Sequence, residues 1–149
     1  MTRYFEDFSP GETFELGAKS VTPEEIINFA REFDPQPFHT DPQAARHSSF
    51  GGLVASGVHT FAMFMRLFVD GLLTDAANLG GAGADDMRFL APVRPGDTIS
   101  ARVIIQPQTR PSATKHDRGI LVIRGELRDQ DDQLVWHATI TSIMGRRRT

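Results

Sequence analysis

The sequence contains no cysteine, which excludes disulfides, thiolate nucleophiles and cysteine-ligated metal sites. It has no excess of positive charge either. The formal net charge of −3 at pH 7 gives no electrostatic reason to expect nucleic acid or an anionic membrane as a partner. The arginine run at residues 146–148 is interpreted as a solvated tail. The length of 149 residues, with 40% hydrophobic side chains, fits a single domain over residues 1–149.

The sequence also lacks an apolar run suited to a membrane span. Its most apolar stretch, residues 52–73, is interrupted by His59, Arg66 and Asp70, which favours a buried helix. The N-terminal residues contain no apolar core of signal-peptide length. We therefore expect a cytoplasmic protein without a membrane partner.

The first half of the chain has helical patterns. Residues 22–33 (TPEEIINFAREF) predict a helix that opens with a capping box between Thr22 and Glu25. Its apolar stripe recurs at helical spacing and includes Phe33. A second, longer helix is predicted to begin between Leu53 and Gly57. It is apolar nearly all round, so we expect other structure to wrap it.

The second half of the chain has strand patterns. Alternating apolar residues predict strands near residues 87–93, 98–108, 120–129 and 134–145, after a glycine-rich break at 78–86. One buried helix followed by four long strands predicts an α+β fold in which an antiparallel sheet curls around the helix.

A short loop between the two helices carries the residues best suited to chemistry. In FDPQPFHTDPQAA, residues 33–45, the prolines forbid a continued helix and hold Asp34 and His39 on a rigid loop. Such a pair is either a structural corner or a site of proton transfer, since a carboxylate and an imidazole can jointly hold a water. Asp41 is expected to cap the next short helix. His39 and Asp41 lack a third ligand, so no metal site is predicted.

The same loop resembles the signature of the MaoC-like dehydratases, a hotdog-fold family that includes (R)-specific enoyl-CoA hydratases. The family pattern is roughly D-x-N-P-x-H-x-D-P-x-x-A. This chain matches it with Asp34, Pro37, His39, Asp41, Pro42 and Ala45, and has Gln36 where asparagine is usual. FGGLVASG at 50–57 and MRFLAPVRPGDTI at 87–99 resemble further family segments. The resemblance covers nearly the whole chain and implies a single hotdog domain.

The resemblance implies that Asp34 and His39 are a catalytic pair which adds water across C2–C3 of a trans-2-enoyl thioester, or removes it. The enolate-like transition state then needs backbone N–H donors. Ala84, next to Gly83, matches the family's oxyanion position, and Gly57 with Ser56 at the start of the central helix is a second source. No cofactor is implied beyond the coenzyme A of an acyl-CoA substrate, and a homodimer is expected.

The chain departs from the family at the residues around this pair. Ser56 stands where many relatives have histidine. Ala62 stands near the serine that usually supports the catalytic aspartate, so that hydrogen bond is expected to be missing. His59 and Thr60 are candidates to replace it. Residues proposed to contact the substrate are Phe38, Phe61 and Met65 for the acyl chain and Arg88 and Arg94 for the coenzyme A phosphates.

Two other functions are compatible with the same fold. A thioesterase would also use a carboxylate and a water, but its acid usually lies on the central helix, which here carries no carboxylate before Asp70. A non-catalytic acyl-CoA-binding module would have no physical need for both Asp34 and His39.

Overall fold

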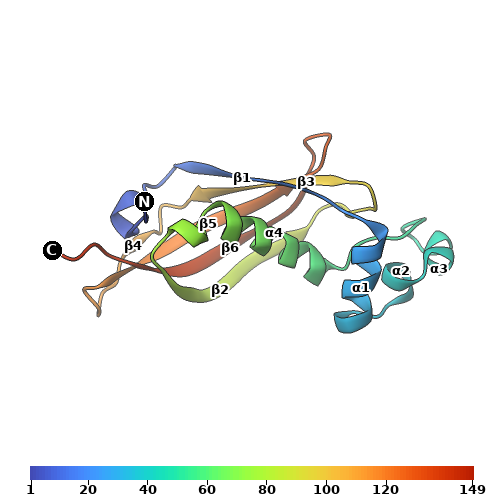
Figure 1. Cartoon of the computed structure of the whole chain (residues 1–149), viewed down its shortest axis with the longest axis horizontal. Coiled ribbons are helices and arrows are strands. Elements are labelled where there is room, and N and C mark those ends of the chain that lie inside the picture. The colour runs from blue at the N-terminus through green and yellow to red at the C-terminus, as the bar shows by residue number, and fades with distance from the viewer.

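The protein is one antiparallel sheet curved around one long helix (Figure 1). The computed structural model describes all residues from Met1 to Thr149. The sheet has the strand order β1–β3–β5–β6–β2, with β4 added beside β5. Its strands are β1 (Thr13–Ser20), β2 (Asn78–Phe89), β3 (Thr98–Ile105), β4 (Arg110–Pro111), β5 (Arg118–Arg128) and β6 (Leu134–Gly145). This is the hotdog fold that the sequence predicts.

Four helices and two short 3-10 turns complete the chain. They are α1 (Pro23–Phe33), α2 (Pro37–Thr40), α3 (Pro42–Arg46), α4 (Gly57–Gly71), η1 (Phe5–Asp7) and η2 (Leu73–Asp75). The first three helices gather beyond the N-terminal end of α4, at the opposite end of the molecule from both termini (Figure 1). None of the helices is long and apolar enough to cross a membrane.

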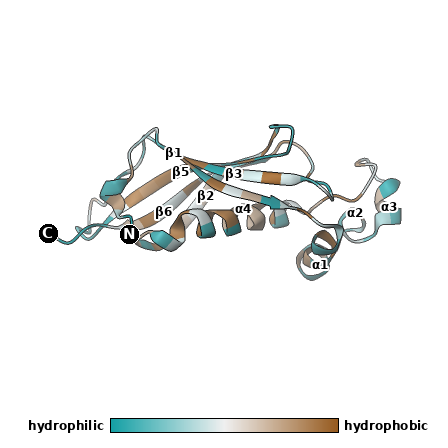
Figure 2. Ribbon diagram, turned by 45° about the horizontal axis from the view of Figure 1, so that its top comes forward, coloured by the Kyte–Doolittle hydropathy of each residue, from teal (hydrophilic) through white to brown (hydrophobic).

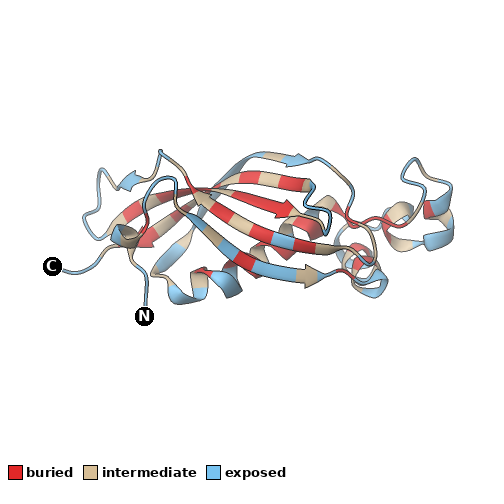
Figure 3. Ribbon diagram, turned by 90° about the horizontal axis from the view of Figure 1, so that it is seen from above, coloured by how far each residue is buried: buried red, intermediate tan, exposed pale blue.

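The core lies between α4 and the inner face of the sheet. Inward and outward residues alternate along β3, β5 and β6, which gives the banded burial pattern in Figure 3. Phe64 of α4 packs against Trp136 of β6 with ring centroids 4.7 Å apart. A Cβ at Gly125 would lie 2.5 Å from the Phe64 ring, so this glycine lets the helix approach the sheet. Burial of these large rings ties α4 to the sheet.

Helix α1 begins as its sequence predicts. Thr22 Oγ1 accepts a hydrogen bond from the Glu25 N–H at 3.2 Å, and Glu25 Oε1 accepts one from the Thr22 N–H at 2.7 Å. The predicted apolar stripe is only partly buried. Ile26 and Ala30 are buried, but Phe33 is 62% exposed because α1 extends beyond the end of the sheet.

The predicted glycine-rich break at residues 78–86 is wrong, because these residues form most of β2. The strand pairs with β6 through three irregularities in register, and Gly80 takes a positive φ of 135°. No residue of β2 is buried, so glycines are tolerated there without loss of core packing. Nearly every residue of this edge strand is exposed.

The long helix α4 starts at Gly57, within the predicted interval, but it is not wrapped on all sides. The sheet covers one side of the helix, as Figure 2 shows, and the other side is open. Val58 and Val69 are exposed, and Phe61 and Met65 are only half-buried. An uncovered apolar helix face beside an unpaired strand edge is the main surface feature of this chain.

Candidate active site

Asp34 ends helix α1 and points back toward the start of α4. Its N–H still donates to the Ala30 carbonyl at 2.8 Å, while Pro35, the next residue, keeps Asp34 out of the helical conformation. Ser56 Oγ donates to Asp34 Oδ2 at 2.7 Å, and Gln36 Nε2 donates to Asp34 Oδ1 at 2.7 Å. Each carboxylate oxygen is therefore held by a neutral donor, in a side chain that is 22% exposed.

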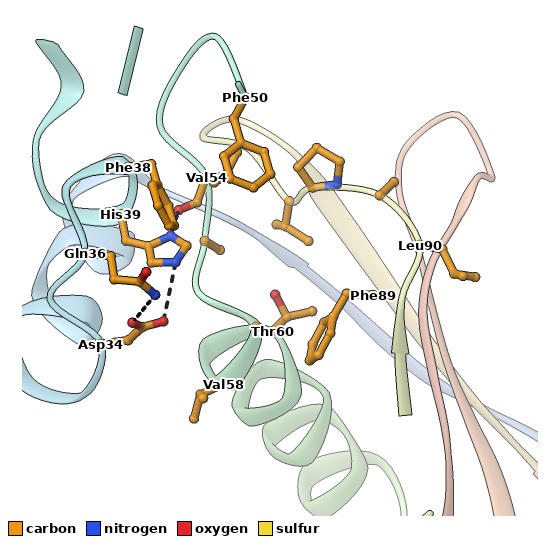
Figure 4. Close-up of a pocket in the computed structure, with 15 residues that line it drawn as sticks. Asp34, Gln36, Phe38, His39, Phe50, Val54, Val58, Thr60, Phe89 and Leu90 are labelled. Atoms are coloured by element: carbon orange, nitrogen blue, oxygen red, sulfur yellow. Dashed lines mark hydrogen bonds and ion pairs between the residues drawn. The ribbon is translucent and has the colours of Figure 1, made fainter. Parts of the chain in front are cut away.

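His39 faces Asp34 from the short helix α2. The imidazole is buried, and its Nδ1 lies 2.6 Å from the Val54 carbonyl oxygen. Because a carbonyl can only accept, Nδ1 must carry a hydrogen, which leaves Nε2 of the neutral ring as an acceptor. Nε2 lies 3.4 Å from Asp34 Oδ2 (Figure 4). One water that donated a hydrogen to each atom would satisfy both acceptors.

The electrostatics keep Asp34 ionised. The hydrogen bond from Ser56 lowers the pKa of Asp34 below its ordinary value of 3.8, and the hydrogen bond from Gln36 and the positive charge of a protonated His39 lower it further. Partial burial opposes this effect without reversing it. At neutral pH the pair therefore offers a carboxylate beside an imidazole that can accept a proton.

The two side chains lie on the wall of a cavity of about 550 Å³. It opens between α2, the first turn of α4 and the segment that follows β2, and most of its lining is apolar (Figure 4). The lining residues are Asp34, Gln36, Phe38, His39, Phe50, Val54, Ala55, Gly57, Val58, Thr60, Phe89, Leu90, Ala91, Pro92 and Val93. Such a mostly apolar cavity with a few convergent polar groups is typical of small-molecule sites.

Helix α4 begins at this cavity and supplies a free donor to it. Ser56 caps the helix, because its Oγ accepts from the Val58 N–H at 3.2 Å while it donates to Asp34. The Gly57 N–H, at the first helical position, has no acceptor in the chain. One serine thus links the carboxylate to a helix N-terminus whose dipole favours negative charge.

The sequence predicts that Asp34 lacks a supporting hydrogen bond, and this prediction is wrong. Ser56 provides that hydrogen bond. Neither proposed replacement contacts Asp34. Thr60 lines the cavity but donates its hydroxyl to the Ser56 carbonyl at 3.1 Å. His59 is turned toward α1, where its ring stacks on Phe29 with centroids 4.5 Å apart.

The other predicted site residues are scattered. Phe38 lines the cavity, with its ring 5.4 Å from that of Phe50. Phe61 and Met65 lie outside it, and the Phe61 ring packs against Trp136. Gly83 and Ala84 pair with β6 in the edge strand and do not line the cavity.

The two predicted cations also lie outside the lining. Arg94 approaches the cavity, since its Nη2 donates to the Phe50 carbonyl at 2.8 Å. Arg88 is exposed and lies 3.5 Å from Asp86.

Several lining residues were missed from the sequence. Phe50, Phe89 and Pro92 come from segments that meet only when the sheet closes beside α4. Their segments resemble those of the family, but nothing in the local sequence marks these three residues as lining a cavity. The structure has no group of three or more histidine, aspartate and glutamate side chains arranged to hold a metal ion.

Comparison with known proteins assigns the chain to a family. The family model described as "MaoC like domain" matches residues 7–120. The chain is 27% identical to the uncharacterized protein YdeM of Bacillus subtilis over 95% of this chain and 98% of that protein. It is 33% identical to an (R)-specific enoyl-CoA hydratase of Rhodospirillum rubrum, over 68% of this chain and 69% of the hydratase.

A solved structure extends the likeness to the whole fold. The crystal structure of the MaoC-like dehydratase from Rhodospirillum rubrum superimposes with a TM-score of 0.91 at 38% identity, covering 98% of this chain and 99% of that one. Both the sequence match and the shared fold include the loop that carries Asp34 and His39. The chain belongs to the MaoC-like domain family.

Proposed function

We propose that this protein hydrates the C2–C3 double bond of a trans-2-enoyl thioester, or dehydrates the matching 3-hydroxyacyl thioester. One observation carries the proposal. Asp34 Oδ2 and His39 Nε2 lie 3.4 Å apart in the wall of a cavity, which Gly57 also lines. The N–H of Gly57 has no hydrogen-bond acceptor in the chain. The (R)-specific enoyl-CoA hydratase among the similar proteins supports the same chemistry.

In the proposed mechanism, a water donates one hydrogen to each member of the pair. His39 Nε2 removes a proton from this water as the water oxygen bonds to C3, and the π electrons move to C2 and the thioester oxygen. The imidazolium then delivers the proton to C2 on the same face. Asp34 keeps its negative charge throughout, orients the water and stabilises the imidazolium. One water is added, and both side chains return to their starting states.

The developing negative charge on the thioester oxygen needs a donor. We assign this role to the Gly57 N–H, because it lines the cavity and begins a 15-residue helix whose dipole favours an anion. A contribution from Gly83 or Ala84 stays a prediction, since both lie on the edge of β2 away from the cavity of their own chain. Coenzyme A would enter as part of the substrate, with Arg94 as the nearest candidate for its phosphates.

We also propose that the working unit is a homodimer formed through β2 and the open face of α4. Ten of the 12 residues of β2 are exposed, and the strand contains neither proline nor lysine, which commonly block pairing at sheet edges. Phe61, Met65 and Val69 offer apolar area beside it. The full chain should elute with twice the mass of one chain in light scattering. A monomer at micromolar concentration would contradict this part. The cytoplasmic location stays a prediction.

The test of the function uses the purified full chain with crotonyl-CoA and two readouts. We expect the absorbance of the conjugated enoyl thioester to fall while no free thiol is released. His39→Ala should slow this hydration by about 10²- to 10⁴-fold, the usual contribution of a general acid–base. Circular dichroism and thermal melting would establish that the variant is folded.

Two results would contradict the assignment and point elsewhere. Release of free thiol without hydration would favour a thioesterase, although α4 carries no carboxylate before Asp70. Binding of acyl-CoA without either reaction would favour the non-catalytic binding module. The first outcome would leave Asp34 and His39 as water-activating residues, whereas the second would remove their catalytic role.

A further inference from the structure

Phe89, the last residue of β2, rests on the first turn of α4. A Cβ built on Gly57 would lie 2.9 Å from two carbons of the Phe89 ring and 3.3 Å from a third, and no other side chain is nearer. Only glycine therefore lets the ring reach this position. Figure 4 shows Phe89 beside the first turn of α4, with Asp34 and His39 on the other side of the helix start.

The backbone that carries this ring is fixed. Phe89 pairs with Trp136 of β6, and the next residue, Leu90, donates its N–H to the Val135 carbonyl at 2.9 Å. The Phe89 side chain itself is 55% exposed. The backbone of Phe89 is therefore held rigidly by the sheet. The position of the ring over Gly57 is set by its contact with the helix rather than by burial.

The opposite side of the cavity has a different character. Phe50 packs near Phe38 there, and its carbonyl accepts a hydrogen bond from Arg94 at 2.8 Å. A ligand with a phosphate-bearing carrier is favoured to lie with its carrier toward this guanidinium. Its acyl group then extends past Asp34 and His39 toward Phe89. In this orientation, the acyl carbons beyond C2 and C3 contact the Phe89 ring.

We propose that Phe89 is a specificity-determining residue that limits the length of the acyl chain, so that the site takes short acyl thioesters. The ring closes the acyl end of the cavity at the level of Gly57, and longer chains must displace it from the helix. The identity of the ligand as an acyl thioester rests on the proposed function. The choice of Phe89 as the specificity-determining residue rests on its contact with Gly57.

The test measures binding without chemistry, so that it is independent of hydration. Isothermal titration calorimetry would compare butanoyl-CoA with decanoyl-CoA, neither of which has a double bond to hydrate. The wild-type chain should bind butanoyl-CoA at least as tightly as decanoyl-CoA. Phe89→Ala should raise the affinity for decanoyl-CoA relative to butanoyl-CoA by about tenfold or more, as expected when a few methylenes gain apolar room.

Leu79→Ala is the matched control, because Leu79 lies on the same strand, is 53% exposed and does not line the cavity. It reports any change that comes merely from altering the β2 surface, and its ratio of affinities should stay at the wild-type value. The proposal is overturned if Phe89→Ala changes the ratio less than about twofold, or if Leu79→Ala changes it equally. A chain that shows this selectivity but no turnover would refute the proposed hydration alone.

A second pair of variants tests the contact directly. Gly57→Ala keeps the backbone N–H but places a Cβ against the ring, so it should alter butanoyl-CoA affinity in the wild-type chain. In the Phe89→Ala background the same substitution meets no ring and should have little effect. This non-additivity, about fivefold or more, is typical of residues in contact. Additive effects would show that the ring does not rest on Gly57, and would overturn the proposal.

Discussion

The two ends of the molecule each hold a carboxylate network, and they differ in what balances the negative charge. At the end with both termini, Arg147 Nη2 donates to Asp7 Oδ1 and Oδ2 at 2.8 and 2.6 Å, and Arg146 Nε donates to Glu6 Oε1 at 3.1 Å. At the cavity end, the Asp34 carboxylate receives its two hydrogen bonds from the neutral groups of Ser56 and Gln36.

This difference separates a structural carboxylate from one available for chemistry. Both aspartates have a lowered pKa, chiefly through the guanidinium of Arg147 for Asp7 and the hydroxyl of Ser56 for Asp34. The charge of Asp7 is cancelled by its partner, whereas neutral donors leave the charge of Asp34 uncancelled. An uncancelled carboxylate attracts water hydrogens and stabilises a nearby imidazolium. The comparison therefore makes distinct predictions for the two ends.

The largest expected contrast is between Asp34→Asn and Asp7→Asn. At position 34 the amide would keep a similar shape but remove the charge, so crotonyl-CoA hydration should fall by about 10²- to 10⁴-fold. Asp7→Asn removes a charge at the far end and should leave turnover unchanged. Steady-state rates of both folded variants check this. A residual rate within about tenfold of wild type for Asp34→Asn would remove Asp34 from the mechanism.

The next effect in size comes from Ser56→Ala. Loss of its hydroxyl removes the main cause of the lowered pKa of Asp34, so that pKa should rise and the acidic limb of kcat/KM should move to higher pH. The rate near neutral pH should fall about tenfold, as expected for a hydrogen bond to a charged group. The lost helix cap should also destabilise the protein by about 1 kcal/mol.

Ser56→Thr is the control for this prediction, since it keeps a hydroxyl that can cap the helix and donate to Asp34. It should retain most of the activity and the wild-type pH profile. An acidic limb that stays in place in Ser56→Ala would mean that this serine supports the helix alone.

The part of the site that the sequence predicts is the part built by local rules. Pro35 follows the end of α1, and Pro37 and Pro42 start α2 and α3, which brings Asp34 and His39 close together in the chain. His39 lies on the short helix α2 and not on the loop that the sequence predicts. Asp41 caps α3 as expected, accepting from the Gln43 N–H at 3.0 Å. The hotdog architecture likewise follows from one apolar helix and alternating strands.

The parts that could not be predicted depend on how distant segments meet. Ser56 reaches Asp34, 22 positions away, only because α4 starts where α1 ends. Phe89 becomes a cavity wall only when β2 pairs with β6 and ends over Gly57. The glycines of β2 predict an interruption of secondary structure, because strand propensity carries no information about which strand lies at the edge of the sheet.

A smaller effect should distinguish the two ends by acid titration. Burial lowers the pKa of His59 below its ordinary value of 6.5, so the unfolded chain takes up this proton before the folded one. The cavity end should therefore lose stability as the pH falls from about 6.5. Glu6 and Asp7 have lowered pKa values, so their contribution is lost only below their ordinary values of 4.5 and 3.8.

His59→Phe tests this order, because it keeps the stack on Phe29 but cannot take up a proton. The variant should show a flatter dependence of Tm on pH between 7 and 5 than the wild-type chain. His116→Phe, at an exposed position, serves as the control. A Tm profile of His59→Phe that follows the wild type would show that His59 is not the group responsible.

The smallest effect is expected from Arg147→Ala at the far end. The sequence suggests a solvated tail for residues 146–148, yet Arg147 also lies over the Tyr4 ring, with its guanidinium carbon 5.2 Å from the ring centroid. Exposed ion pairs contribute little and are screened by salt. Tm should therefore fall slightly at low salt and match the wild type in concentrated salt, with hydration unchanged in both. A fall in turnover would contradict the distinction between the two ends, because it would show that the Arg147–Asp7 ion pair affects a site at the opposite end of the sheet.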